Sequence, residues 1–364
     1  MREKFFELIR FSIDDSAAEP SDIRNADWYV LHRMAVEQAL TGVLFRGVKK
    51  MPKEILPCRE LLLKWYAESE SIARQNKLLY KTAAAVSGFF NEGGFRCCIL
   101  KGQGNAMLYP DPYMRMPGDI DIWLEGGERK VIDYIRSKWK SVSCYYHHAE
   151  VPDFHGVPVE VHYRPSFQFN FIHNVRIQRF FQKMSDEQFS NRTGLPDDVG
   201  SICVPVLSFN LIFQMSHIAN HFFHEGIGLR QLMDYFFLLQ QDISDADKAE
   251  CARRLKYFGM YNFASAVMYV LQEVFGLDAN RTIVAPDEMR GRLLLEEILL
   301  AGNFGHYDKR AGHDASANKL IKNIQRLNRN MRFAVYYPSE CLCEPFFRLY
   351  HFFWRCRQRM YSLV

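Results

Sequence analysis

The first 94 residues carry apolar side chains at the three- and four-residue steps that are typical of amphipathic helices. Residues 5–9 and 31–44 show this spacing clearly. A longer helical pattern covers residues 57–91 and stops at Gly93-Gly94, because consecutive glycines favour the end of a helix. The pattern therefore predicts an N-terminal helical segment over residues 1–94.

The pattern changes at residue 95, where short runs of alternating apolar and polar residues replace the helical spacing. The predicted elements are, in order, a strand at 96–101, a short helix that ends by 109, a strand at 119–124, a helix at 128–139, and strands at 143–151 and 157–164. Strands that alternate with helices and then form a hairpin favour a mixed sheet. Residues 95–168 are thus predicted to form a compact α/β core.

Helical spacing returns after residue 168 and continues to the end of the chain, with a polar connection at 302–317. The predicted fold class is therefore α+β: a small mixed-sheet core (95–168) between an N-terminal helical segment and a C-terminal helical domain (169–364). The basic, aromatic stretch 348–359 is predicted to form an amphipathic helix with a solvated face, and binding to a membrane surface is the alternative interpretation.

Composition and charge restrict the class of protein. Hydrophobic residues make up 48% of the chain and charged residues 24%, and the net charge is +4. This charge suits an anionic ligand such as a nucleotide, but it does not support a nucleic-acid-coating surface. The chain shows neither a signal peptide nor an apolar run of about 20 residues, so we expect a cytoplasmic protein without a membrane span. Its nine cysteines lack metal-binding spacing and suit free thiols.

Two carboxylates share one face of the strand predicted at 119–124. Residues two apart in a strand point the same way, so Asp119 and Asp121 project together while Ile120 and Ile122 face the core. Adjacent carboxylates repel each other, and a divalent cation relieves that repulsion. Carboxylate oxygens suit Mg²⁺ or Mn²⁺, so the sequence predicts a site for one of these ions.

A third carboxylate lies in the last predicted strand of the core. Glu160 is flanked by valines, and His162 shares its face of the strand. On a neighbouring strand, Glu160 would complete a three-carboxylate site of the kind that holds two metal ions for phosphoryl or nucleotidyl displacement, and it could help to deprotonate an acceptor. His162 could contact substrate or orient a ligand. The alternative for Glu160 is an ion pair with Arg115 or Arg164.

Phosphate recognition is predicted at the end of the first strand. Lys101 offers a positive charge, and Gly102 and Gly104 allow the backbone to approach a phosphate at the start of a helix. Arg115, shortly before Asp119, could neutralise phosphate charge. A solvated strand end is the alternative for Lys101, and a surface ion pair is the alternative for Arg115.

Histidines and charged residues in the C-terminal helical domain form a second set of candidates. His217 and His221 share one helical face, with His224 a further turn away. They are predicted either to form a wall on the acceptor side of the cleft or to be core residues. The spacing also resembles that of zinc ligands, but the glutamate of an HExxH motif is absent. Asp234 is placed to pair with Arg230 at i, i+4, and both are possible acceptor-side residues.

These motifs resemble a known family. The segment Ile99-Leu-Lys-Gly-Gln-Gly-Asn-Ala-Met-Leu-Tyr-Pro-Asp-Pro-Tyr-Met-Arg-Met-Pro-Gly-Asp-Ile-Asp-Ile-Trp-Leu124 resembles an uncharacterised bacterial nucleotidyltransferase family of the DNA polymerase β-like superfamily. The resemblance extends weakly to Asp234. It implies a nucleotidyltransferase core with Asp119 and Asp121 as metal ligands and Glu160 as the third acid. The superfamily usually has Gly-Ser or Gly-Gly where this chain has Lys101-Gly102.

The leading hypothesis is the transfer of a nucleoside monophosphate from an NTP to a hydroxyl or phosphate on a small molecule, protein or peptide. A degenerate, antitoxin-like nucleotide-binding module is the alternative that Lys101-Gly102 suggests. A DxD glycosyltransferase acting on nucleotide sugars is a further one, disfavoured because a helical segment and a single strand precede the aspartates. The sequence determines neither the nucleotide, nor the acceptor, nor the oligomeric state.

Overall fold

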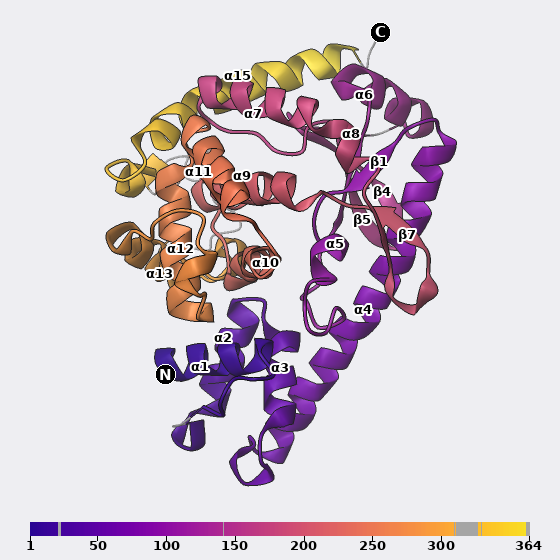
Figure 1. Ribbon diagram of the computed structural model, residues 1–364. Coiled ribbons are helices and arrows are strands. Elements are labelled where there is room, and N and C mark those ends of the chain that lie inside the picture. The colour runs from indigo at the N-terminus through magenta and orange to yellow at the C-terminus, as the bar shows by residue number, and fades with distance from the viewer. Residues whose placement is uncertain (21–22, 141, 309, 311–326, 329, 362–364) are drawn as a thin grey trace.

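The computed structural model describes residues 1–20, 23–140, 142–308, 310, 327–328 and 330–361, with side chains up to residue 358 (Figure 1). The N-terminal segment is helical, as predicted. It contains α1 (Arg2–Ile13), α2 (Trp28–Glu37), α3 (Thr41–Lys50) and the 34-residue α4 (Arg59–Glu92). Helix α4 ends before Gly94, whose positive φ of 81° is easily adopted by glycine. Figure 1 shows α4 running from the N-terminal helices to the sheet.

The sheet has five strands in the order β1-β2-β5-β4-β3. Strands β2 and β5 pair in parallel, whereas the other three pairs are antiparallel, so the sheet is mixed as predicted. The predicted strand at 143–151 is wrong as a single element, because residues 145–147 interrupt it and its two parts pair with each other. The strands are β1 (Cys97–Ile99), β2 (Ile120–Leu124), β3 (Ser143–Cys144), β4 (His148–Phe154) and β5 (Val157–His162).

The two faces of the sheet have different chemistry. On one face, Ile120, Ile122 and Val161 belong to an apolar core that also contains buried residues of α4 and α6 (Gly127–Lys138). The opposite face carries Asp121, Glu160 and His162, which line a cavity together with residues of the C-terminal helices. The alternation along β2 and β5 therefore separates an apolar face, which packs in the core, from a face that carries ionisable side chains.

The C-terminal part is mainly helical but contains a two-stranded hairpin. The prediction of helices throughout was wrong for β6 (Arg192–Gly194) and β7 (Ser201–Cys203), because strands of three residues are too short to show an alternating pattern. The helices are α7 (Phe171–Lys183), α8 (Ser185–Gln188), α9 (Leu207–His224), α10 (Leu229–Leu239), α11 (Asp245–Tyr257), α12 (Tyr261–Phe275), α13 (Glu288–Ala301) and α15 (Pro338–Tyr361). Of the predicted connection at 302–317, residues 309 and 311–317 lie outside the described residues.

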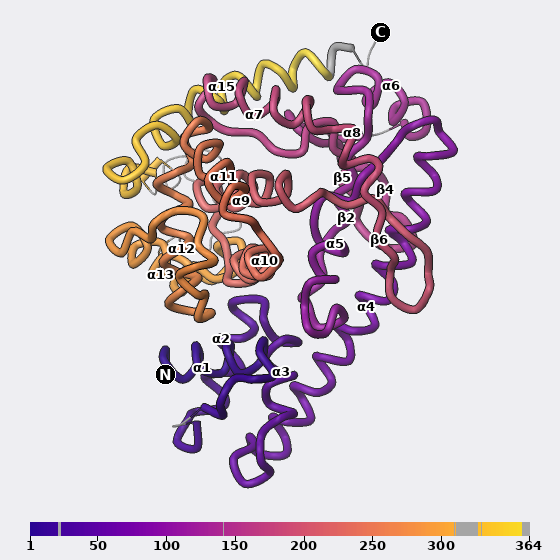
Figure 2. Tube along the Cα trace, in the orientation of Figure 1, coloured from indigo at the N-terminus to yellow at the C-terminus, as the bar shows by residue number. Residues whose placement is uncertain are grey.

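The division into three segments stays a prediction, and an apolar core crosses it. One hydrophobic cluster joins α1 and α3 to α9, α10 and α12, and Phe6, Phe222 and Val267 all belong to it. The tube in Figure 2 shows the C-terminal helices curving back towards the N-terminal ones. Among the described residues, no helix combines the length and apolarity that crossing a membrane requires.

Candidate active site

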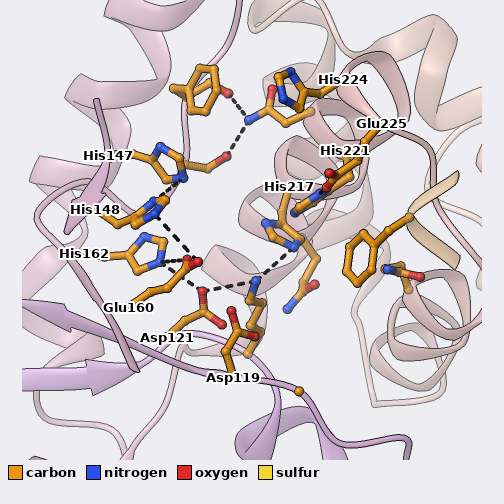
Figure 3. A pocket seen from close by; sticks show the side chains of 18 of the residues that line it. Asp119, Asp121, His147, His148, Glu160, His162, His217, His221, His224 and Glu225 are labelled. Carbon is orange, nitrogen blue, oxygen red and sulfur yellow. Dashed lines mark hydrogen bonds and ion pairs between the residues drawn. The ribbon is translucent and has the colours of Figure 1, made fainter. Parts of the chain in front are cut away.

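A cavity of about 680 Å³ lies beside the polar face of the sheet. Residues of β2, β4 and β5 line one side of it, and residues of α9, α10 and α15 line the other. Figure 3 shows the carboxylates on the sheet side and the histidines of α9 facing them. The cavity is large enough for a ligand the size of a nucleotide.

The three predicted metal-binding carboxylates meet at the floor of this cavity. Strands β2 and β5 are in register with Asp121 opposite Glu160, and Asp119 directly precedes β2. One oxygen of each carboxylate lies within 4.8 Å of one oxygen of the others. Asp121 is only 2% exposed, and its Oδ2 is buried without a hydrogen-bond partner. A buried carboxylate oxygen without a donor is a ready ligand for a cation, so this donor set fits Mg²⁺ or Mn²⁺.

Two cations hold Asp121 in its charged form. Lys101 Nζ lies 3.1 Å from Asp121 Oδ1, and His162 Nε2 lies 2.9 Å from the same oxygen. Burial acts to raise the pKa of Asp121, but Lys101 and His162 outweigh burial and hold this pKa below its ordinary value. Burial likewise opposes the charge of Lys101, and the carboxylates around it nevertheless raise the pKa of this ammonium. Asp121 is therefore ionised and available as a ligand at neutral pH.

Glu160 is surrounded by histidines rather than by arginines. Its carboxylate lies 3.5 Å from His162 Nε2 and 3.7 Å from His148 Nε2. The alternative pairing with Arg115 or Arg164 is not formed, since Arg164 binds Glu128 instead. Burial acts to raise the pKa of Glu160, but the histidines lower it to about 2. A carboxylate with so low a pKa is a weak proton acceptor. This favours a role for Glu160 in holding a cation over a role in deprotonating an acceptor.

His162 and His148 are fixed on their outer sides. His162 Nδ1 lies 3.2 Å from the carbonyl oxygen of Arg164, and His148 Nδ1 lies 3.0 Å from His147 Nε2. Both Nε2 atoms are thereby turned towards Glu160, and His148, Glu160 and His162 also have ligand atoms within 4.8 Å of one another. Burial acts to lower the pKa of His162, but Asp121 and Glu160 raise it to about 9.

The predicted phosphate-binding glycines differ in position. Gly102 lines the cavity with a φ of 63°, a conformation that glycine adopts without strain. Gly104 does not line it: a Cβ built at Gly104 would lie 2.8 Å from a side-chain carbon of Val204. Gly104 thus permits close packing, and the helix after Gly102 is only the four-residue α5 (Gln103–Ala106). A phosphate contact by Gly104 is not supported.

Arg115 and Asp234 form a buried ion pair that joins the core to α10. Arg115 Nε and Nη2 donate to the two oxygens of Asp234 at 2.8 and 2.7 Å, and Tyr109 Oη donates to Asp234 at 2.6 Å. The predicted i, i+4 pairing of Asp234 with Arg230 was wrong, because Arg115 occupies both carboxylate oxygens. Arg230 instead donates to the carbonyl oxygen of Met116 at 3.2 Å. Both arginines line the cavity, with Arg115 committed to Asp234.

Comparison with known proteins identifies the family. A family model for an uncharacterised nucleotidyltransferase matches residues 24–276, which is more than half of the 364 residues. The chain belongs to this nucleotidyltransferase family. None of the curated proteins matches it. Among solved structures, the Thermotoga maritima CCA-adding enzyme complexed with tRNA shares 11% sequence identity over 76% of this chain and 80% of its own, with a TM-score of 0.18. That similarity is too weak to support an inference.

The three carboxylates face a wall of histidines from α9. In this nucleotidyltransferase, His217 Nε2 lies 3.3 Å from Lys101 Nζ, and the rings of His217 and His221 are 4.3 Å apart. Burial, followed by the charge of Lys101, holds the pKa of His217 well below its ordinary value, so this imidazole is neutral. His221 Nδ1 lies 2.5 Å from Glu225 Oε1. Among the described residues, no possible three-ligand metal group contains His217 or His221, so the zinc interpretation is unsupported.

Several cavity residues escaped prediction from the sequence. His147 and His148, which line the cavity, were predicted to lie inside a continuous strand. Two adjacent histidines in this part of the core could have indicated a functional site. His351 of α15 also lines the cavity, and its ring lies 6.3 Å from that of Tyr145. No local pattern relates a residue near the C-terminus to the core, because that contact arises only from the packing of α15.

Proposed function

We propose that this member of the nucleotidyltransferase family is a metal-dependent enzyme of the DNA polymerase β-like superfamily. It transfers a nucleoside monophosphate from an NTP to a hydroxyl or phosphate acceptor, which is a small molecule, a protein or a peptide. The observation that carries the proposal is the meeting of Asp119, Asp121 and Glu160 on adjacent strands, with Asp121 Oδ2 buried and unpartnered.

The side chains have separate tasks in this reaction. Asp119, Asp121 and Glu160 would hold Mg²⁺ or Mn²⁺, which would supply charge neutralisation for the triphosphate and the attacking oxygen. The acceptor oxygen, with any hydroxyl proton released to solvent, forms a bond to the α-phosphorus, the bond from that phosphorus to the bridging oxygen breaks, and pyrophosphate leaves. Lys101, with its Nζ at the carboxylates and its side chain on the cavity wall, is positioned to contact a phosphate.

The acceptor would lie between the carboxylates and the α9 wall. His217 and His221 line this side, together with Arg230 of α10. His217 is neutral, and its Nε2 accepts a hydrogen bond from the Lys101 ammonium, so this imidazole would help to position Lys101 beside the acceptor. Asp234 acts indirectly by fixing Arg115, and it therefore has a positioning role.

Calorimetric titration of each NTP, with Mg²⁺ or Mn²⁺ present, tests the proposal. We expect one NTP to bind the wild-type chain in a metal-dependent manner, and we expect Asp119→Ala/Asp121→Ala to lose that binding because the cation loses two ligands. Asp133→Asn, an exposed carboxylate on α6, is the matched control and should bind like wild type. Equal NTP binding by the Asp119→Ala/Asp121→Ala variant would contradict the proposal.

One observation favours the degenerate, regulatory module as a second candidate. Lys101 Nζ, 3.1 Å from Asp121 Oδ1, can neutralise this carboxylate without a metal ion. The variant Lys101→Met separates the two functions. If Lys101 contacts phosphate, NTP affinity should fall about ten- to hundredfold, the range for a hydrogen bond to a charged group.

The same titration of Lys101→Met with the metal alone completes this test. In the degenerate module, Lys101 replaces the cation, so its removal should strengthen metal binding and leave NTP binding unchanged. In the enzyme, NTP binding weakens. An unchanged affinity for both the NTP and the metal ion would exclude both proposed roles of Lys101.

A further inference from the structure

Large apolar side chains are exposed along α15 and the adjacent part of α7. Phe346 is 67% exposed and Phe353 is 61% exposed. The two helices lie together along the upper rim of the molecule in Figures 1 and 2, and the rings of Phe171 and Tyr350 are 5.9 Å apart. We call these exposed residues the α7–α15 face: Phe171, Ile172, Val175, Leu342, Phe346, Leu349, Tyr350, Phe352 and Phe353.

The exposed apolar residues occupy one side of α15. Leu342, Phe346, Leu349 and Phe353 follow one another at steps of three or four, which places them on a single helical stripe. The other side of α15 packs against the protein, since Phe347 is buried and stacks on Phe167 with ring centroids 4.9 Å apart. The outward stripe therefore contributes little to the core, and a contiguous exposed apolar surface of this kind marks an interaction site.

The charged residues that α7 and the second half of α15 themselves contribute are all basic. Residues 171–183 and 345–364 contain no aspartate or glutamate. The two acids earlier on α15 are directed elsewhere: Glu340 accepts a hydrogen bond from the Phe169 amide at 3.2 Å, and Glu344 is 1% exposed. The basic residues of these two ranges are Arg176, Arg179, Lys183, Arg348, Arg355, Arg357 and Arg359.

We propose that the α7–α15 face binds the surface of a lipid bilayer that carries anionic headgroups. Exposed phenylalanines and leucines bordered by arginines are the features of a helix that lies in the membrane interface. A second copy of the chain fits less well, because a twofold contact would bring the arginines of α15 against each other and neither α7 nor the second half of α15 supplies an acidic partner.

The proposed docking also positions the candidate active site. Phe347, Arg348 and His351 of α15 line the cavity, while the next residues of the same helix form the exposed stripe. The cavity would then lie beside the bilayer, with α15 between them. This inference concerns binding alone and does not depend on nucleotidyl transfer.

Flotation of the full-length chain with vesicles, without nucleotide, tests the inference. We expect binding to vesicles of phosphatidylcholine mixed with phosphatidylglycerol, much weaker binding to phosphatidylcholine alone, and weakening by salt because exposed charges are screened. Phe346→Ser/Phe353→Ser should bind at least about tenfold more weakly, because two apolar anchors are lost. Leu63→Ser/Leu300→Ser, which changes two exposed leucines on α4 and α13, is the matched control and should bind normally.

Light scattering of the same proteins separates the lipid from a second copy. The inference predicts that Phe346→Ser/Phe353→Ser leaves the mass in solution unchanged. A wild-type dimer that this variant dissociates would overturn it and assign the face to self-association. Absence of binding to the anionic vesicles, or equal binding by both double variants, would overturn it as well. Circular dichroism verifies that each variant is folded.

Discussion

Replacing Asp121 by asparagine is expected to abolish metal-dependent NTP turnover, measured as pyrophosphate release. The substitution keeps the shape of the side chain but removes the charge that Lys101 and His162 contact at 3.1 and 2.9 Å. It also removes an anionic ligand from the group of Asp119, Asp121 and Glu160. We expect a loss of at least about 100-fold, because even partners that only support metal ligands contribute up to that much.

A matched control distinguishes loss of the site from loss of the fold. Asp133→Asn changes a carboxylate on α6 that faces solvent beside Arg129, so its turnover should equal that of wild type. Thermal unfolding of Asp121→Asn should remain cooperative, since the side-chain volume is conserved. Turnover of the folded Asp121→Asn variant at the wild-type rate would exclude Asp121 from catalysis.

Removing the carboxylate of Asp234 is expected to give the largest loss of stability. Asp234→Ala deprives the buried Arg115 guanidinium of the two carboxylate oxygens to which it donates, and it leaves Tyr109 Oη without its partner. Breaking a buried ion pair on one side lowers the free energy of unfolding by about 3–5 kcal/mol. Urea unfolding measures this value. Asp133→Ala, which removes an exposed partner of Arg129, should have little effect.

A double variant tests whether the loss comes from the orphaned charge. Arg115→Met with Asp234→Leu should recover part of the stability, since a buried pair replaced by apolar residues no longer leaves a charge behind. A double variant less stable than Asp234→Ala would contradict this account.

Burial acts to raise the pKa of Asp234, but Arg115 outweighs it and lowers this pKa below the ordinary 3.8. The pair's contribution is therefore fully present above pH 3.8 and is lost as the pH falls below it.

The main elements of the core followed from local pattern. The helix predicted at 57–91 corresponds to α4, and the strand at 119–124 corresponds to β2. Long periodic segments are predictable because the backbone period fixes which side chains share a face. The hairpin of β6 and β7 escaped notice because each strand has three residues. The functional roles of the candidate residues stay predictions.

The sequence by itself determined which chemical groups share a face: Asp119, directly before β2, with Asp121 on that strand, and Glu160 with His162 on β5. This follows from the two-residue period of a strand, which needs no information from elsewhere in the chain. Only the tertiary structure decided that β2 and β5 are neighbours with Asp121 opposite Glu160. It likewise paired Arg115 with Asp234, 119 positions away, because contacts between distant segments depend on how whole elements pack.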